Sequence, residues 1–403
     1  MKVTINKCEP KGKIEAPPSK SMAHRLLISA GLANGRSVVH SVALSQDILA
    51  TLDCLKALGA GITIDGNTVT VDGIGKPQTQ SETLNCRESG STLRFFLPLC
   101  MLSESEKTLC GSETLLHRPL SVYEDICKAH GIKFLKKSNQ ITVGGKLTPG
   151  EYTVQGNISS QFITGLMFAL PLLNGDSKIN IIPPIESMSY IKMTIDALRT
   201  FGVTVDIFNE NTLIIKGNQQ YKPQEVFVEG DYSNAAFFSA MNYLGGNVTI
   251  TGLPKDSLQG DKVYEQLFAL LKNGTPKIDI SDCPDLGPIL MALAAAKNGA
   301  TFVGTKRLKI KESDRGAAMA EELKKFGVTV IVEENQITVT PENFLKPSEV
   351  LYCHNDHRIV MALSVLLLLV GGSIDGAQAV NKSMPDFFNK LAELGVVFNC
   401  ETI

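Results

Sequence analysis

Basic residues beside helix starts are the feature of this sequence that could do chemistry. Near the amino end, Pro18 holds the backbone extended, and Ser19 or Ser21 can cap the helix that follows. Lys20 and Arg25 stand at that helix start. Free backbone N–H groups and the helix dipole make such a start an anion site. The pattern predicts anion binding, although an ordinary capped helix with two exposed basic residues would look the same.

The same arrangement recurs along the chain. Gly90 and Arg94 lie in a segment of small and hydroxyl residues, where glycine lets a ligand approach the backbone. Arg118 stands directly before a proline. The segment 159–161, which is Ser159-Ser160-Gln161, offers two hydroxyls and an amide, neutral donors that suit a phosphate or a sugar. Each segment could also be a helix cap and nothing more.

The densest group of charges is Lys311, Glu312 and Arg315, at the start of a helix that we expect over 312–326. On a helix, Lys311 and Arg315 share one face, and Glu312 lies three residues before Arg315. Charge runs are usually solvated faces, but apolar and small neighbours surround this one. Flanking cations lower the pKa of a carboxylate, and burial raises it. The group is therefore a candidate for acid–base chemistry beside an anion.

Three more residues extend the pattern. Arg358 begins the most apolar helix, expected over 356–370, where a guanidinium could bind a carboxylate or phosphate through two bonds. Lys382 precedes a further helix start, and Asp285 precedes a buried helix, where capping alone would explain it. Basic residues at helix starts thus outnumber the conspicuous carboxylates in a chain of net charge −2. This excess implies a small ligand with several negative charges.

The elements that must position these residues form an internal repeat. A helix ends at a glycine and a short alternating β hairpin follows, about 70 residues apart, at Gly59, Gly131, Gly202, Gly327 and Gly395, with a weaker copy at 267–280. Six copies predict two domains of three units, each a group of helices wrapped by small sheets. Helices are expected over 21–33, 91–102, 160–173, 234–244, 286–297, 312–326, 356–370 and 386–394.

Composition excludes several classes of function. The chain has 403 residues and no basic block, which argues against nucleic-acid binding as its main role. Nine scattered cysteines without a C-x-x-C pair indicate free thiols in a reducing cytosol, and neither a disulfide framework nor a zinc site. The sequence shows no signal peptide, and its longest apolar run, 359–370, is too short to span a membrane. We expect a cytoplasmic protein without a metal.

Taken in order, these motifs resemble those of the EPSP synthases, the 3-phosphoshikimate 1-carboxyvinyltransferases of the enolpyruvyl transferase family. The resemblance covers essentially the whole chain. The motifs that carry it are Pro18-Ser19-Lys20-Ser21 with Arg25, Ser89-Gly90-Ser91-Thr92 with Arg94, Arg118-Pro119, Ser159-Ser160-Gln161, Asp285, Lys311-Glu312-Ser313-Asp314-Arg315, Asn355-Asp356-His357-Arg358 and Lys382.

The resemblance implies an α/β fold of two similar domains. Each would contain three βαβαββ units, and the active site would lie in the cleft between the domains. Residues 1–18 and 230–403 would form the domain on the phosphoenolpyruvate side, with the catalytic carboxylates, and residues 19–229 the domain on the shikimate-3-phosphate side. The enzyme would transfer the enolpyruvyl group of phosphoenolpyruvate to the 5-hydroxyl of shikimate-3-phosphate by addition–elimination and release phosphate. The resemblance implies no metal or organic cofactor, and we expect a monomer.

The resemblance also assigns residues. Asp285 would take the proton of the 5-hydroxyl, and Glu312 with Lys20 would serve C3 and the departing phosphate. The residues expected to bind shikimate-3-phosphate are Lys20, Ser21, Arg25, Ser159, Ser160, Gln161, Ser187, Tyr190, Asp285 and Lys311. Those expected to bind phosphoenolpyruvate are Lys20, Gly90, Arg94, Arg118, Gln161, Arg315, Arg358 and Lys382. Glyphosate, the family's inhibitor at the phosphoenolpyruvate site, should bind if Gly90 keeps that space open.

Two departures and two alternatives remain open. Glu88 and Arg307 stand where many or some family members have asparagine. The enolpyruvyl transferase that acts on UDP-N-acetylglucosamine shares the fold but usually carries an active-site cysteine, and Cys110 lies upstream of Arg118. Ser159-Ser160-Gln161 and the 311–315 segment favour shikimate-3-phosphate instead. The other alternative is an anion-binding clamp without catalysis.

Overall fold

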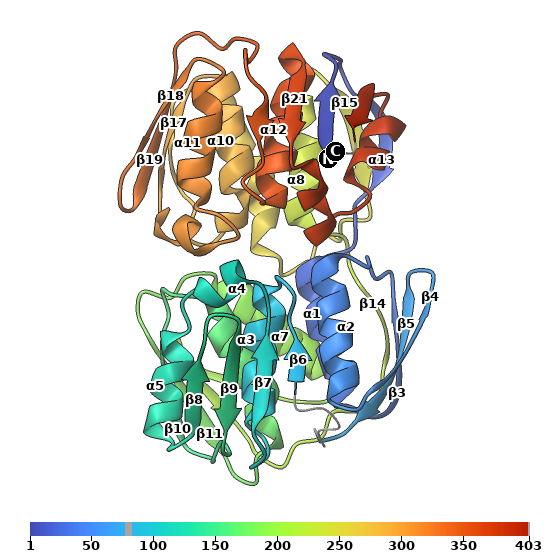
Figure 1. Cartoon of the computed structure of the whole chain (residues 1–403), viewed down its shortest axis with the longest axis vertical. Coiled ribbons are helices and arrows are strands. Elements are labelled where there is room, and N and C mark those ends of the chain that lie inside the picture. The colour runs from blue at the N-terminus through green and yellow to red at the C-terminus, as the bar shows by residue number, and fades with distance from the viewer. Residues whose placement is uncertain (77–82, 402–403) are drawn as a thin grey trace. The chain divides into compact units, whose positions relative to one another are not determined.

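The structure, a computed structural model, describes residues 1–76 and 83–401. The chain forms two compact units, whose elements are labelled in Figure 1. We call Pro18–Glu229 the central unit, and Met1–Pro17 together with Gly230–Ile403 the terminal unit. The chain therefore passes from one unit to the other twice. The sequence placed the first crossing after Pro18, one residue later than the structure does.

Five small sheets in the described part of the chain share one topology. In the clearest example, β6 (Thr83–Asn85) runs parallel to β7 (Lys107–Cys110), and β7 runs antiparallel to β9 (Gln140–Gly144). The sheet ends at β8 (Lys133–Lys136), the other arm of a hairpin with β9. With the helices between its strands, this is a βαβαββ unit. The α/β fold of two repeated units is thereby confirmed.

The remaining strands build the same sheet elsewhere. The central unit contains the sheets β14–β3–β5–β4 and β10–β11–β13–β12, formed by β3 (Asn34–His40), β4 (Gly61–Asp65), β5 (Thr68–Ile74), β10 (Glu151–Gln155), β11 (Ser177–Ile182), β12 (Asp206–Asn209), β13 (Thr212–Ile215) and β14 (Glu225–Phe227). The terminal unit contains the sheet β16–β17–β19–β18, formed by β16 (Lys277–Asp279), β17 (Ala300–Val303), β18 (Val328–Val332) and β19 (Gln336–Pro341).

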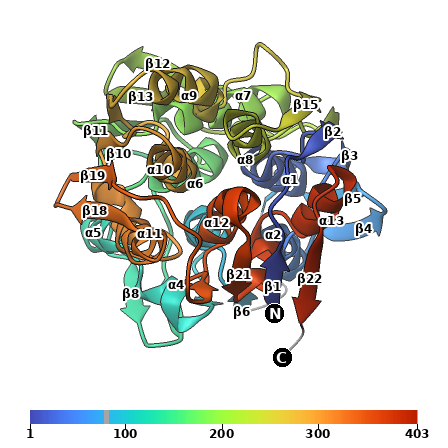
Figure 2. The same ribbon diagram turned by 90° about the horizontal axis from the view of Figure 1, so that it is seen from above.

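The first residues of the chain complete the terminal unit. Strand β1 (Lys2–Ile5) lies between β21 (Gly372–Asp375) and β22 (Phe398–Glu401) and is antiparallel to both (Figure 2). The fourth strand of this sheet is β20 (Leu351–Tyr352), parallel to β21. Because the last repeat borrows its strand from the amino end, the terminal unit cannot form until both ends of the chain are present. Strand β2 (Lys11–Glu15) then pairs in parallel with β15 (Asn247–Thr251).

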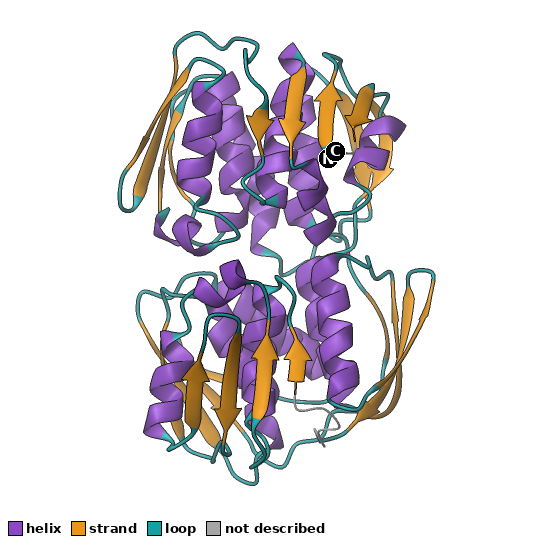
Figure 3. Ribbon diagram, viewed as in Figure 1, coloured by secondary structure: helices purple, strands orange, loops and turns teal. Residues whose placement is uncertain are grey.

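Helices are gathered between the sheets of each unit (Figure 3). The central unit contains α1 (Lys20–Leu32), α2 (Gln46–Ala57), α3 (Gly90–Cys100), α4 (Glu113–His117), α5 (Ser121–Ala129), α6 (Ser160–Ala169), η1 (Leu170–Leu172) and α7 (Met188–Thr200). The terminal unit contains α8 (Tyr232–Tyr243), η2 (Gly260–Val263), α9 (Tyr264–Lys272), η3 (Pro284–Leu286), α10 (Gly287–Ala296), η4 (Lys306–Ile310), α11 (Arg315–Lys324), α12 (His357–Val370), η5 (Ala377–Lys382) and α13 (Phe387–Glu393).

The two most apolar helices are buried almost throughout, as the sequence predicted. Every residue of α10 from Gly287 to Ala295 is buried, and so is every residue of α12 from His357 to Leu368. None of the helices in the described ranges is long and apolar enough to cross a membrane.

The glycine stops are confirmed at five positions, and the weaker copy at 267–280 has no such stop. Gly59, Gly131, Gly202, Gly327 and Gly395 all have a positive φ, between 65° and 108°. The weaker copy at 267–280 contains no hairpin, because α9 leads into the single short strand β16. Only one short β run fits between that helix and the turn at Pro284. The stretch therefore begins the next sheet.

Two helix starts also differ from the prediction. Helix α11 begins at Arg315 because the side chain of Asp314 accepts a hydrogen bond from Ala317 N at 3.1 Å. Glu312 thus precedes the helix, and Lys311 is extended. Asp285 does not cap α10, since it lies in η3, where no side-chain cap bond forms. Pro288, in the first turn of α10, has no N–H group that a side chain could cap. The carboxylate of Asp285 is therefore available for other partners.

The close packing of α6 on α3 yields a test of the central unit. A Cβ atom at Gly165 would collide with the hydroxyl of Tyr123 and the carbonyl of Arg94. Gly165→Ala should therefore destabilise the protein by about 1–3 kcal/mol, measured as a lower urea midpoint by circular dichroism. Gly274→Ala, where a Cβ meets nothing within 4 Å, is the control and should leave the midpoint unchanged. Equal midpoints for both variants would contradict this account.

Candidate functional site

The guanidinium of Arg315 organises the charged residues of the terminal unit. It is 1% exposed and donates to three carboxylates: Nε to Asp356 Oδ2 at 2.8 Å, Nη1 to Asp285 Oδ1 at 2.9 Å and Nη2 to Glu312 Oε2 at 2.6 Å. Burial by itself would lower the pKa of Arg315, but these carboxylates raise it above its ordinary value. Arg315 therefore stays charged and holds together the two carboxylates that the sequence singled out.

Asp285 is surrounded by cations. Lys311 Nζ lies 3.1 Å from its Oδ1, and Arg358 Nη2 lies 3.2 Å from its Oδ2. Burial would raise the pKa of Asp285, but Arg358, Lys311 and Arg315 together lower it well below its usual range. Asp285 is therefore an ionised carboxylate whose basicity depends on how closely these cations approach it. We call Asp285, Lys311, Glu312, Arg315, Asp356 and Arg358 the Arg315 cluster.

The ammonium group of Lys311 holds its proton less tightly than that of an exposed lysine. Burial lowers the pKa of its ammonium group; Asp285 opposes this effect, and the guanidiniums of Arg307 and Arg315 add to it. Arg307 thus acts on the cluster through its charge, although the sequence left it out of the site.

Lys382 joins the cluster through the backbone. Its Nζ donates to the carbonyl of Asn355 at 2.7 Å, next to Asp356. Asp356 in turn caps α12, since its Oδ1 accepts from Arg358 N at 2.9 Å. The short segment before α12 therefore contacts both cations: Lys382 through the carbonyl of Asn355, and the backbone of Arg358 through Asp356.

In the central unit, Lys20 lies at the start of α1 in an ion pair. Ser19 caps this helix by accepting from Met22 N, which decides between the two predicted caps. Lys20 Nζ lies 2.7 Å from Oδ2 of Asp47, the second residue of α2. Both side chains are mostly buried, so the pair fixes the ammonium group at the helix start.

Arg25 is buried between α1 and α7. Its guanidinium donates to Thr194 Oγ1 at 2.9 Å and to the carbonyls of Ser21 and Tyr190 at 2.6 and 3.1 Å, and it lies over the rings of Phe95 and Tyr190. Burial lowers the pKa of Arg25 to about 10. The hydrogen bonds of Arg25 recorded among the described residues all go to neutral oxygens. A buried cation held in this way is an attractive partner for an anion.

The segment 159–161 lies at a helix start, as expected, and so does Ser187, which only the resemblance had named. Ser159 caps α6 and accepts from Gln161 N at 3.3 Å, and Ser160 is the first residue of that helix. Ser187 precedes α7 in the left-handed conformation, with φ 60°. Tyr190, whose carbonyl bonds to Arg25, lies in the first turn of α7. Ser187 and Tyr190 are therefore close together at the start of the same helix.

A second arginine links α3 to α6. Arg94 Nη1 donates to Gln161 Oε1 at 2.6 Å, and Arg94 Nη2 donates to the carbonyl of Pro119 at 3.3 Å. Gln161 Nε2 donates to Ser91 Oγ at 3.0 Å. Two residues of α3 thus orient the amide of Gln161 on α6.

Gly90 lies where two arginines approach the backbone. A Cβ atom at this position would come within 2.7 Å of Arg118 Nη1 and 3.4 Å of Arg94 Nη1. The absence of a side chain therefore allows both guanidiniums to lie beside the start of α3. The sequence predicted that Gly90 lets a ligand approach the backbone, and the neighbours found here are the two arginines.

Sequence reasoning missed several buried carboxylates, among them Asp356, Asp47, Asp261 and Glu322. In the sequence, Asp356 stands out only as part of the motif 355–358, although its side chain is fully buried and bonded to Arg315. Asp47 and Asp261 were not noticed at all. For Asp47, a signal was available: Ser45 two residues earlier is a helix cap. No local sequence pattern indicates that Asp261 is buried, because the charged groups near it come from other segments of the chain.

Cys110, the residue that kept the UDP-N-acetylglucosamine alternative open, ends β7 and is partly buried. Its Sγ donates to the carbonyl of Leu84 at 3.6 Å, and burial with the neighbouring Cys86 raises the pKa of the thiol. A thiol with a raised pKa is a poor acid at neutral pH.

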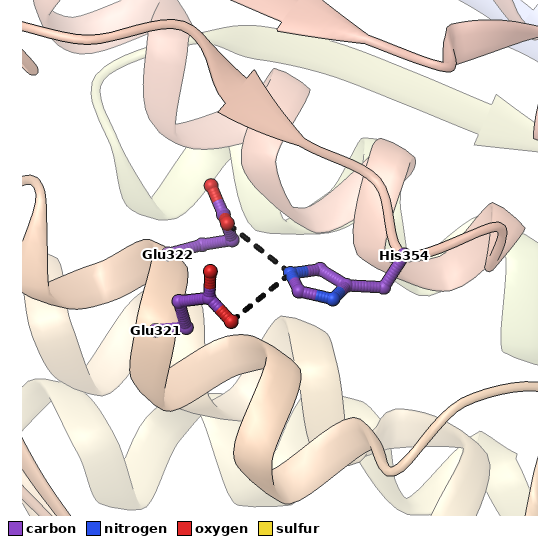
Figure 4. A group of neighbouring side chains, drawn as sticks. All are labelled: Glu321, Glu322 and His354. Carbon is purple, nitrogen blue, oxygen red and sulfur yellow. Dashed lines mark hydrogen bonds and ion pairs between the residues drawn. The ribbon is translucent and has the colours of Figure 1, made fainter.

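Glu321, Glu322 and His354 form a further cluster of polar side chains in the terminal unit (Figure 4). Each offers an atom that could bind a metal ion, and these atoms lie within 4.8 Å of one another. However, Lys325 Nζ lies 2.9 Å from both oxygens of Glu322. An ammonium group in that place repels a second cation, so we interpret the group as a polar bridge between two segments.

The comparisons with known proteins agree with each other. The family model described as "EPSP synthase (3-phosphoshikimate 1-carboxyvinyltransferase)" matches residues 7–391. Proteins named 3-phosphoshikimate 1-carboxyvinyltransferase from Clostridium kluyveri and Clostridium novyi are each 41% identical to this chain; the alignments cover 98% of this chain and 97% and 98% of those proteins. Two solved structures of EPSP synthase from Acinetobacter baumannii have TM-scores of 0.79 and 0.80 at 21% and 20% identity. These cover 99–100% of this chain and 100% of theirs, and they support the fold.

Asp261 supplies a prediction on pH. Burial, reinforced by the charge of Asp285, raises the pKa of Asp261 to about 7. Between its unfolded pKa and about 7, the folded chain keeps a proton that the unfolded chain has lost, so this contribution to stability is lost as the pH rises. We expect the urea midpoint of the wild type to fall relative to that of Asp261→Asn between about pH 5 and about pH 8. The control is Asp65→Asn, at an exposed position beside a hairpin turn. If the urea midpoints of the wild type and Asp261→Asn differ by the same amount at every pH, the raised pKa of Asp261 is contradicted.

Proposed function

Since the chain belongs to the EPSP synthase family, we propose that the Arg315 cluster and the arginines of the central unit bind its two anionic substrates and move the protons of its reaction. The chain transfers the enolpyruvyl group of phosphoenolpyruvate to shikimate-3-phosphate, a step in aromatic amino-acid biosynthesis. The observation that carries the proposal for the site is that Asp285 and Glu312 share one buried guanidinium, that of Arg315.

We propose that shikimate-3-phosphate is bound mainly by the central unit. The buried guanidinium of Arg25, surrounded by neutral oxygens, supports a role in binding the phosphate. Ser21 and Tyr190 contact Arg25 through their carbonyls, which places both beside it. The full set proposed for this substrate is Lys20, Ser21, Arg25, Ser159, Ser160, Gln161, Ser187, Tyr190, Asp285 and Lys311.

Phosphoenolpyruvate carries a carboxylate and a phosphate, and we propose that guanidiniums and ammoniums bind both. The convergence of Arg94 and Arg118 beside Gly90 supports one such contact, since arginine binds planar anions through two bonds. Arg358, the second residue of α12, and Lys382, at the end of η5, provide two more cations. The full set proposed is Lys20, Gly90, Arg94, Arg118, Gln161, Arg315, Arg358 and Lys382.

The proposed chemistry is an addition followed by an elimination. The 5-hydroxyl oxygen of shikimate-3-phosphate bonds to C2 of phosphoenolpyruvate, its proton passes to Asp285, and C3 gains a proton from Glu312. C3 then returns a proton to Glu312 as the bond between C2 and the phosphate oxygen breaks. Asp285 gives up its proton to the departing phosphate, which Lys20 stabilises. Anionic substrates would draw Arg358 and Lys311 toward themselves. The pKa of Asp285 would then rise, which makes the carboxylate a better base when substrate is bound.

The assay that tests the reaction is phosphate release from phosphoenolpyruvate, run in parallel with shikimate-3-phosphate and with UDP-N-acetylglucosamine. Turnover with shikimate-3-phosphate alone is the expected result. Turnover with the nucleotide sugar would shift the site to Cys110. Binding of both substrates without turnover would indicate a clamp that has lost its chemistry.

We further propose that the protein works in the cytoplasm as a monomer and needs neither a metal nor an organic cofactor. Nine free cysteines among the residues 1–76 and 83–401 are consistent with a reducing compartment. Light scattering coupled to size-exclusion chromatography tests the oligomeric state, and activity after dialysis against a chelator tests the requirement for metal.

Substitution of the two carboxylates tests their roles as proton carriers. Asp285→Asn and Glu312→Gln keep the size of each side chain but remove the group that exchanges a proton, so each should lower kcat by a factor of about 10² or more. Glu321→Gln changes an exposed carboxylate outside the cluster and should keep the wild-type kcat. Near-normal kcat in both cluster variants would refute the assigned roles.

The space at Gly90 should decide the affinity for phosphoenolpyruvate and for glyphosate. The added methyl group of Gly90→Ala presses on Arg118 Nη1, which must move. We expect the inhibition constant of glyphosate to rise by about tenfold or more and KM for phosphoenolpyruvate to rise as well, in steady-state kinetics. KM for shikimate-3-phosphate should stay close to that of the wild type. An unchanged inhibition constant would place glyphosate elsewhere.

A further inference from the structure

The carboxylate of Glu322 is fully buried in α11, although the proposed reaction gives it no role. It accepts hydrogen bonds from Lys325 Nζ at 2.9 Å on both oxygens, from the backbone N of Tyr352 at 2.9 Å and from His354 Nε2 at 3.1 Å. Figure 4 shows the ring of His354 directed at Glu322 from the neighbouring segment. A buried carboxylate is costly unless its oxygens are satisfied, and here donors from two chain segments satisfy them.

Glu322 and Arg315 lie on the same face of α11. They are seven residues apart, which is about two helical turns. Arg315 binds Asp356, and Glu322 binds Tyr352 and His354. Helix α11 therefore holds the segment 352–356 at both of its ends, once through a guanidinium and once through a carboxylate.

The segment 352–356 depends on such external bonds. His354 and Asn355 both have a left-handed backbone, with φ of 50° and 54°. This conformation is unfavourable for residues other than glycine and persists where surrounding contacts impose it. Within the segment, Cys353 Sγ accepts from Asn355 N at 3.3 Å and donates to the carbonyl of Gly376 at 3.1 Å.

This segment carries the groups that orient two of the cations assigned to phosphoenolpyruvate. The carbonyl of Asn355 accepts from Lys382 Nζ, and Asp356 caps α12 by accepting from the backbone N of Arg358, the second residue of that helix. Arg358 in turn reaches Asp285. A shift of the segment would therefore move the partner of Lys382 and the start of α12 together.

We propose that Glu322 is a positioning residue for phosphoenolpyruvate binding: by holding Tyr352 and His354 onto α11, it sets the strained turn that places Lys382 and Arg358. The inference rests on the proposed assignment of these two cations to phosphoenolpyruvate. Glu322 itself touches no substrate in this proposal. The carboxylate of Glu322 has two acceptor oxygens, and these bond to donors from two segments of the chain. An apolar side chain of the same size has no acceptor oxygen, and an amide has only one.

The test compares Glu322→Gln with Glu321→Gln. The amide keeps the shape of Glu322 but replaces one acceptor oxygen by a donor, which then faces Lys325 or the N–H of Tyr352. We expect KM for phosphoenolpyruvate to rise by about tenfold, while KM for shikimate-3-phosphate stays within about twofold. Glu321→Gln, on the exposed neighbour, should leave both constants unchanged. A lower melting temperature with an unchanged KM for phosphoenolpyruvate would mean a purely structural role and would overturn the proposal.

A second pair of variants covers the case in which Glu322→Gln does not fold. His354→Ala removes one donor to Glu322, and His354→Gln can restore it through its amide. We expect KM for phosphoenolpyruvate to rise in the alanine variant and to return toward the wild-type value in the glutamine variant. Equal KM values in both His354 variants and the wild type would overturn the proposal.

Parallel measurements on Arg358→Gln and Lys382→Gln separate this inference from the site assignment. If both raise KM for phosphoenolpyruvate and the Glu322 and His354 variants do not, the inference fails and the assignment stands. If neither raises it, the assignment fails, and the inference falls with it.

Discussion

The buried guanidinium of Arg315 is the interaction on which the terminal unit's site depends. It is paired with carboxylates of residues 285, 312 and 356, which come from three separate segments. Each of these charges would be costly to bury alone, and loss of one member of a buried pair typically costs about 3–5 kcal/mol. The arrangement is therefore stable only as a whole, and it fixes the distance between the two carboxylates that carry the proposed chemistry.

The two units use charge in different ways, although both are built from the same repeat. In the central unit, the buried Arg25 bonds to neutral oxygens, so its positive charge is available to an anion. In the terminal unit, the cations are paired with acids whose protonation they control, as the lowered pKa of Asp285 shows. One unit is suited to hold an anion, and the other is suited to move protons beside one. A shared fold thus supports both halves of a two-substrate reaction.

The repeat explains why the site residues stand at helix starts. In each sheet the first strand is followed by a helix, and the chain emerges at the carboxyl end of that strand. Gly90 follows β6, Ser159 follows β10, Asp285 follows β16 and Asp356 follows β20. The same local geometry, repeated, presents N–H groups and side chains at equivalent places in each unit. The strained segment before α12 is one such place, and α11 holds it from both ends.

Local signals in the sequence determined the elements and most of the candidate residues. Caps such as Ser159, the glycine stops and the alternation of the hairpins act over a few residues, so they can be read from spacing. Only the tertiary structure decided what those residues contact. From the residues alone, capping a helix was enough to explain Asp285, but its partners Lys311 and Arg358 lie 26 and 73 residues away. Lys20, the partner of Asp47, and Tyr352 and His354, two of the partners of Glu322, also lie far along the chain. Ion pairs of this kind depend on which segments packing brings together, and no spacing in the chain encodes that.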